Sequence, residues 1–294
     1  MNTKTRRRLE IFDIFNHILM VLLIAVCILP IVFVFARATS SGQAINAGRV
    51  IFWPVDFNLY SFRSILDHPN FLVSYRNTIL YTFLGTTFTM FITCLAAYPL
   101  SKMWLTGRKF FMFFFILTMF FNGGLIPNFV LITTLGMLNT MWALVVPLAF
   151  SQFFIILAMG SVQGLPAELE ESAIMDGLNP WQTLFFIILP LIKPALATIA
   201  LFASLNFWND WFNAMIYLHS NTRFPVMLLL RNIMMGGDIT AAHLDAGGGG
   251  PGSFLNVVSL RSAAIILVML PITALYPFLQ RFFVKGMLIG SIKG

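Results

Sequence analysis

Acidic side chains are concentrated in one short stretch of this chain. Between Pro166 and Gly177 the acidic residues are Glu168, Glu170, Glu171 and Asp176. Carboxylates at this density can form charge-assisted hydrogen bonds with Lys or Arg side chains of another protein. Acid–base or nucleophilic catalysis would need paired carboxylates, a histidine cluster or a nucleophile with its base, and the chain shows no such constellation. The stretch is therefore expected to bind rather than to catalyse.

Two further patterns that could bind a nucleotide or a metal are incomplete. The glycine run at 246–252 is not followed by the Gly-Lys-Ser/Thr of a phosphate-binding loop, and that motif occurs nowhere else in the chain. Cys27 and Cys94 each lie inside an apolar run, which predicts two buried thiols rather than a disulfide or metal ligands. We expect no metal site, no nucleotide site and no ATPase domain in this chain.

The composition predicts that lipid surrounds most of the molecule. Of the 294 residues, 59% are hydrophobic and 10% are charged, and the mean hydropathy is +0.86. A soluble domain carries about 25% charged residues. The net charge of +7 would indicate nucleic acid in a soluble protein, but here it is assigned to loops at a membrane face, with no nucleic-acid partner. The expected fold class is all-α, a polytopic membrane protein.

Six apolar segments are candidates to cross about 30 Å of hydrocarbon. They lie near Phe15–Ala36, Thr78–Leu100, Phe110–Phe129, Thr140–Gly160, Pro194–Trp208 and Ala263–Leu279. The first follows a basic N-terminus, as a signal peptide would, but its apolar run of roughly 19 residues exceeds the usual h-region of about 7–15 and predicts a retained span. The middles of the other five carry no ionisable residue, which argues against a proton-driven carrier.

The distribution of Lys and Arg predicts the orientation. Basic residues occur in the N-terminal tail, in the loop around 101–109 and in the C-terminal tail, so both termini are expected in the cytoplasm. The loop 165–190 then also faces the cytoplasm, and the segments 37–75 and 209–260 face outward. The whole chain, 1–294, is expected to form one transmembrane domain in a bacterial cytoplasmic (inner) membrane.

Local signals in the acidic stretch predict helix, turn and helix. Pro166 suits a first helical turn, Gly177 suits the position that ends a helix, and Asn179-Pro180 forms an N-cap followed by proline at the first helical position. Ala173 and Gly177 are four residues apart and present small side chains on one face. A connector lying on the lipid surface would usually be basic, so the acidic face favours docking to a soluble partner.

The same stretch resembles the hallmark of permease subunits of binding-protein-dependent ABC importers, which reads E-A-A, three residues, G, nine residues, I-x-L-P. Here the pattern is Glu171-Ser172-Ala173, Gly177 and Ile187–Pro190, with Ser172 as the single departure. The segments 121–147, 208–211 and 280–294 are similar to the carbohydrate-uptake (maltose-type) branch, especially its complex-oligosaccharide group.

The resemblance implies a type I importer permease fold and several partners. These are a second permease subunit, an ATPase dimer that binds ATP and Mg²⁺, an extracytoplasmic solute-binding protein and an oligosaccharide that crosses by ATP-driven alternating access. The resemblance also implies residue roles. The residues expected to couple to the ATPase are Glu171, Ser172, Ala173, Asp176, Gly177 and Pro190, with Pro190 ending the second helix. The tail residues expected to reach the ATPase are Lys285, Gly286, Lys293 and Gly294.

Amides and indoles near the span ends are candidates for a sugar path, because sugars bind through amide hydrogen bonds and aromatic stacking. They are Asn122, Asn128, Asn206, Trp208, Asn209 and Trp211. The same residue types also form interfacial belts and helix–helix contacts. The sequence does not identify the sugar. A uronate oligomer, such as an alginate or pectin fragment, is one of the candidates. A self-sufficient carrier or channel is the alternative function, and a membrane enzyme has no catalytic constellation to support it.

Overall fold

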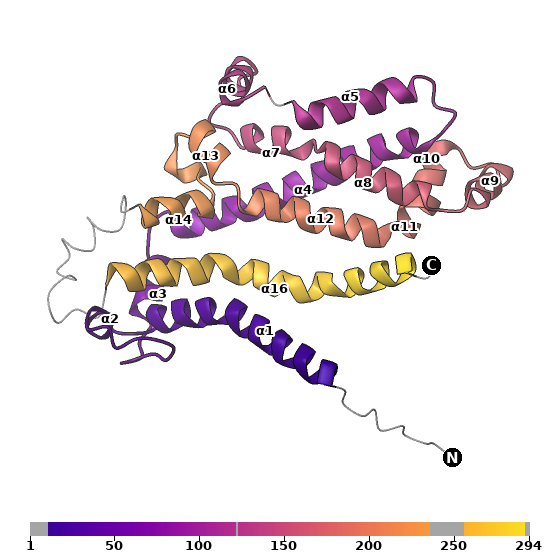
Figure 1. The fold of residues 1–294 in the computed structure, drawn as a ribbon. Coiled ribbons are helices and arrows are strands. Elements are labelled where there is room, and N and C mark those ends of the chain that lie inside the picture. The colour runs from indigo at the N-terminus through magenta and orange to yellow at the C-terminus, as the bar shows by residue number, and fades with distance from the viewer. Residues whose placement is uncertain (1–10, 122, 236–255, 292–294) are drawn as a thin grey trace. The chain divides into compact units, whose positions relative to one another are not determined.

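The computed structural model describes residues 11–121, 123–235 and 256–291, and all regular structure within these ranges is helical (Figure 1). The elements in chain order are α1 (Ile11–Ala38), α2 (Gly42–Asn46), α3 (Tyr60–Leu66), α4 (Phe71–Ser101), α5 (Arg108–Phe120), α6 (Leu125–Thr134), α7 (Trp142–Ala149), α8 (Gln152–Gln163), α9 (Glu168–Met175), α10 (Pro180–Gln182), η1 (Thr183–Ile188), α11 (Leu189–Leu191), α12 (Lys193–Trp208), α13 (Phe212–Tyr217), η2 (Asn221–Arg223), α14 (Val226–Met234) and α16 (Val257–Ser291). The all-α class predicted from the composition is confirmed.

The chain divides into two compact units, one made of residues 1–68 and 232–269 and the other of 69–231 and 270–294. The first unit contains α1, α2, α3 and the start of α16. Most apolar side chains of α1 are exposed, as a lipid-facing helix requires. After α1 the chain turns at Ser40 and Ser41, whose hydroxyl groups bond to the Val55 amide (3.0 Å) and to the Asp56 carboxylate (3.1 Å).

The second unit is built around α4, against which α7, α8 and α12 pack. One face of α4 carries small and hydroxyl-bearing residues, and they are buried: Ser74, Thr78, Gly85, Thr89, Thr93 and Ala97. Positions separated by four or seven residues fall on one helical face, and small side chains there let neighbouring helices approach closely. At Gly85 a Cβ atom would lie 2.4 Å from the ring of Phe207 on α12.

Side chains of α4 also fix the segment that follows α13. The Asn77 amide donates to the Thr222 carbonyl (2.8 Å), the Tyr81 hydroxyl donates to the Arg223 carbonyl (3.0 Å), and Thr78 Oγ1 accepts from the Val226 amide (2.7 Å). Backbone groups outside regular helices must find other partners when they are buried. This end of the unit is therefore held by polar side chains of α4.

Within the described residues, three helices (α1, α4 and α16) contain a stretch long and apolar enough to cross a membrane. Three more spans arise if each bent helix pair counts as one. The pair α7 and α8 bends by 43°, and the pair Pro180–Leu191 and α12 bends by 83°. A single uninterrupted span was expected at 140–160, whereas the span expected at 194–208 lies within α12, which is unbroken. The α7/α8 break occurs because Phe150 and Ser151 are extended and the Ser151 hydroxyl caps α8 by accepting from the Phe154 amide.

The contact at Gly85 gives a stability prediction. Replacing Gly85 with Leu should lower the free energy of unfolding by about 1–3 kcal/mol, because the added side chain must displace Phe207 from a packed interface. The thermal midpoint of the purified protein in detergent measures the effect. Gly160 of α8 is the matched control, since a Cβ there meets no atom within 4 Å and Gly160→Ala should be neutral or slightly stabilising. Equal midpoints for wild type and Gly85→Leu would contradict the packing.

Candidate functional site

The acidic stretch forms a helix that ends at a glycine turn. Helix α9 begins at Glu168, and Asp176 is its C-cap. Gly177 has φ +80°, a left-handed conformation that glycine adopts without steric cost. The Gly177 amide donates to the Ile174 carbonyl and the Leu178 amide donates to the Ala173 carbonyl, both at 3.0 Å. The turn therefore satisfies the last carbonyls of α9 and reverses the chain.

The second helical arm starts at a capping box. The Asn179 side chain accepts from the Gln182 amide, and the Gln182 side chain accepts from the Asn179 amide, both at 2.9 Å. The arm continues through η1, a π-helical turn in which the Leu189 amide bonds to the Leu184 carbonyl. It was predicted to end at Pro190, but it ends at Leu191. Proline lacks an N–H but fits the first turn of a helix, and here it opens α11 after the π turn.

The loop exposes an acidic and apolar surface. Glu171, Ser172, Asp176 and Gly177 are exposed, and the Ser172 hydroxyl donates to the Glu168 carbonyl (2.7 Å). Large apolar side chains stand exposed beside them: Ile174, Met175 and Trp181. Ala173, by contrast, is 1% exposed. Its small side chain faces the interior of the chain, where α9 packs against η1.

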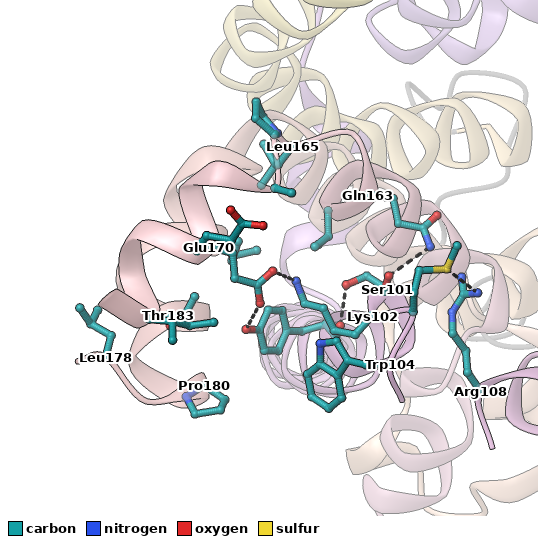
Figure 2. A pocket seen from close by; sticks show the side chains of 18 residues that line it. Ser101, Lys102, Trp104, Arg108, Gln163, Leu165, Glu170, Leu178, Pro180 and Thr183 are labelled. Atoms are coloured by element: carbon teal, nitrogen blue, oxygen red, sulfur yellow. Dashed lines mark hydrogen bonds and ion pairs between the residues drawn. The ribbon is translucent and has the colours of Figure 1, made fainter. Parts of the chain in front are cut away.

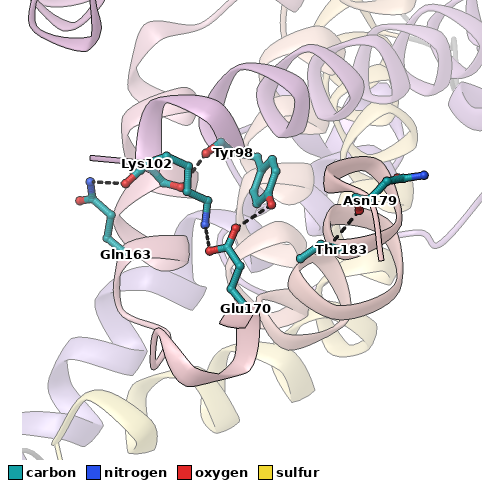
Figure 3. A network of polar contacts seen from close by, with 7 residues as sticks. Tyr98, Lys102, Gln163, Glu170, Asn179 and Thr183 are labelled. Atoms are coloured by element: carbon teal, nitrogen blue, oxygen red, sulfur yellow. Dashed lines mark hydrogen bonds and ion pairs between the residues drawn. The ribbon is translucent and has the colours of Figure 1, made fainter. Parts of the chain in front are cut away.

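Glu170 points inward and is held by the end of α4 (Figure 3). Its carboxylate accepts a hydrogen bond from the Tyr98 hydroxyl (2.8 Å) and pairs with the Lys102 ammonium. The Lys102 ammonium also lies 4.6 Å from the centre of the Tyr98 ring. Sequence analysis named Glu170 only as one of the acidic residues of the stretch, and it did not single out Tyr98 or Lys102. The signal for Glu170 was its position three residues before Ala173, on the same helical face.

A hollow of about 780 Å³ lies beside this ion pair, between α9 and the loop that follows α4 (Figure 2). Trp104, Arg108 and Glu171 are among the side chains that line it. Around the hollow, carbonyl groups at the end of α4 are bonded: Arg108 Nε donates to the Leu100 carbonyl (2.7 Å), and Gln163 donates to the Ser101 carbonyl (3.4 Å). The end of α4 therefore joins α5, α8 and α9.

The candidate sugar-path residues are spread over two regions of the second unit. Asn128 is exposed on α6, whereas Asn206, Trp208, Asn209 and Trp211 cluster at the end of α12. Trp208 is buried with its ring edge-on to Tyr75 (5.9 Å), and Trp211 carries the Arg231 guanidinium 5.2 Å from its ring centre. Asn122 lies outside the described residues.

The predicted tail site is described only in part. Lys285 and Gly286 lie within α16, and Lys293 and Gly294 lie outside the described residues. Among the residues that the structure describes, no three His, Cys, Asp or Glu side chains are grouped so that they could hold a metal ion.

Asp210, between the two tryptophans, was not predicted as a site residue. Its Oδ1 accepts from the Asn213 amide (3.2 Å) and side chain (3.0 Å), while its Oδ2 is buried without a hydrogen-bond partner among the described residues. Burial raises the pKa of this carboxyl, and the two bonds from Asn213 lower it in part. The junction after α12 thus contains a carboxyl group that is easier to protonate than an exposed aspartate.

An all-helical fold with several candidate membrane spans, together with the helix–turn–helix of the loop 165–190, is typical of a membrane permease. Residues 84–289 match the family described as "Binding-protein-dependent transport system inner membrane component". The chain belongs to this family of ABC importer permeases, in its sugar-importer branch. As a permease subunit it is a non-catalytic, multi-pass inner membrane protein. Membership of this family excludes the two alternative functions, a self-sufficient carrier and a membrane enzyme.

Individual relatives cover nearly the whole chain. Protein LplC of Bacillus subtilis (strain 168) is 36% identical over 100% of this chain and 97% of its own length. The polygalacturonan/rhamnogalacturonan transport system permease protein YtcP of the same organism is 35% identical over 97% and 99%. A chain in the crystal structure of a bacterial ABC transporter involved in the import of the acidic polysaccharide alginate is 32% identical, with a TM-score of 0.87 over 96% of this chain and 100% of that one.

The raised pKa of Asp210 gives a pH prediction. A carboxyl whose pKa is higher in the folded than in the unfolded state adds stability at low pH and loses it as pH rises through the folded pKa. The thermal midpoint of the wild type should therefore fall between about pH 4 and neutrality more than that of Asp210→Asn, which keeps the Oδ1 acceptor but does not ionise. Parallel midpoint–pH curves for the two proteins would show that burial does not act on Asp210.

Proposed function

We propose that this chain imports an acidic oligosaccharide and that the loop 165–190 is the handle through which a separate ATPase drives it. The observation that carries the proposal is the geometry of the loop in a chain of this family. Two helical arms meet at Gly177, and the exposed side of the loop combines carboxylates with apolar side chains. Such a surface fits an apolar cleft with basic groups.

The roles of the loop residues follow from their exposure. Glu171 is free to pair with a basic group of the ATPase, and Asp176 adds negative charge at the turn. Ile174, Met175 and Trp181 supply apolar area next to these charges. Gly177 allows the turn, and Ala173 lets the two arms pack closely. ATP and Mg²⁺ are proposed to bind to the ATPase subunits.

Reversing the charge at Glu171 tests the handle. In the complete transporter, Glu171→Lys should weaken association with the ATPase by at least about 2 kcal/mol, roughly thirtyfold, because a carboxylate–cation pair becomes a repulsion. Co-purification of the ATPase and ATP hydrolysis stimulated by the loaded binding protein measure the loss. Glu171→Gln keeps the size without the charge and should lose less.

Gly177→Asp should reduce the same two readouts through strain at φ +80°. The proposed handle would be refuted if Glu171→Lys and Gly177→Asp both retained ATPase association and stimulated uptake.

Two findings support an acidic cargo. The names of YtcP and of the alginate transporter refer to polyuronates, which carry one carboxylate on each uronate unit. In this chain Arg231 and Trp211 place a guanidinium against an indole at the end of α12. An indole face stacks on a sugar ring, and a guanidinium binds a carboxylate in bidentate fashion. Asn206 and Asn209 are exposed and lie close to Trp211 in the sequence, so their amides could bind the hydroxyl groups of a sugar.

Carboxyl-reduced oligosaccharides test the cargo class. With the transporter reconstituted together with its binding protein, oligogalacturonate or oligoalginate should stimulate ATP hydrolysis and uptake. The same oligomers with their carboxylates reduced to alcohols should not, because the guanidinium loses its partner. A neutral oligosaccharide that stimulates as strongly as the uronate would contradict the proposed selectivity for an acidic cargo.

The proposed orientation places both termini and the loop 165–190 in the cytoplasm, as the distribution of Lys and Arg indicates. The segments 37–75 and 209–260 then face the solute-binding protein on the other side. A second permease subunit completes the translocation path. Lys285, Gly286, Lys293 and Gly294 at the C-terminal end are proposed to lie near the ATPase.

A further inference from the structure

We infer that Glu170, Lys102 and Tyr98 form a clamp that fixes the loop 165–190, here called the coupling loop, to α4, and that this clamp positions the loop for transport. The inference rests on the proposed function of the loop, but it concerns residues other than the exposed Glu171. Glu170 and Lys102 have side chains that are 23% and 11% exposed. Their charged groups pair with one another.

The geometry of the clamp restricts movement in more than one direction. One carboxylate oxygen of Glu170 accepts from the Tyr98 hydroxyl (2.8 Å), and the other pairs with the Lys102 ammonium. The ammonium in turn lies over the Tyr98 ring. Tyr98 and Lys102 are four residues apart at the end of α4, so both project from the same side of the helix. Hydrogen bonds are directional, whereas apolar contacts allow sliding.

The covalent connections of the loop are poorly suited to transmit displacement. On one side α9 follows α8 through the turn at 164–167. On the other side the second arm meets α12 at an 83° bend next to Ile192, after the π-helical turn of η1. Bends and π turns are places where helices hinge. The clamp bypasses both junctions and joins α9 directly to α4.

Helix α4 is the element through which a displacement would spread. It packs against α7, α8 and α12, and Tyr98 also belongs to an apolar cluster with Val162 of α8 and with Leu184 and Ile188 of the loop itself. Lys102 is the C-cap of α4, where a positive charge is favoured by the helix dipole. Because the Glu170 carboxylate of α9 is bonded to Tyr98 and Lys102 of α4, a movement of α9 also moves α4 and the helices packed on it.

The test uses the complete transporter with both permeases, the ATPase dimer and the binding protein in proteoliposomes. Removing a single charge leaves its partner buried and unpaired, which can impair folding. The informative variant is therefore the double substitution Lys102→Met with Glu170→Met, because apolar side chains of similar size usually replace a buried ion pair without loss of stability. This variant keeps the docking surface around Glu171 intact.

We expect the double variant to co-purify with the ATPase and to keep its thermal midpoint. Its maximal uptake, and its ATP hydrolysis in response to loaded binding protein, should fall at least about fivefold. The concentration of binding protein that gives half-maximal stimulation should not change, since the docking surfaces are unaltered. The exchange Lys102→Glu with Glu170→Lys should restore part of the rate, limited by the unfavourable charge at the C-cap of α4.

Lys109, an exposed lysine at the start of α5, provides the control. Lys109→Met removes a positive charge close to the end of α4 without altering the clamp, and it should leave coupled uptake unchanged. Wild-type uptake by the double clamp variant would overturn the inference. Loss of ATPase co-purification in that variant would also overturn it, because the clamp would then serve to fold the docking surface. Failure of the proposed function is separate, since it appears as retained coupling in Glu171→Lys.

Discussion

Close packing along one face of α4 is the constraint on which the second unit depends. Helices in lipid gain little from the hydrophobic effect when they associate, so they rely on van der Waals contact and interhelical hydrogen bonds. The buried serine, threonine and glycine residues of α4 allow this contact with α7, α8 and α12. The near approach of Phe207 to Gly85 shows how little space remains.

Polar side chains at the two ends of α4 extend this packing into the loops. Near its start, Asn77, Thr78 and Tyr81 bond to the backbone between Thr222 and Val226. Near its end, Tyr98 and Lys102 hold Glu170. One helix thus contacts both the segment before α14 and the coupling loop.

Two neighbouring glutamates in the loop have different environments because of helix geometry. Successive residues are about 100° apart around a helix, so Glu170 faces α4 while Glu171 is exposed. The same chemical group serves as an internal anchor at one position and is available to an outside partner at the next. The family pattern contains the outward residue, and the inward one depends on a lysine and a tyrosine far away in the sequence.

The sequence by itself determined the helical class, the membrane environment, the family and the helix–turn–helix of the loop, since these follow from apolar content and from local signals such as Gly177 and Asn179. It did not determine that the segment 140–160 bends between α7 and α8 or that Ala173 is buried inside the loop. Nor did it reveal the contact of Glu170 with Lys102 or the unpaired oxygen of Asp210. Those features depend on which helices pack together and on how each is rotated, and only the tertiary structure brings residues distant in the sequence within bonding distance.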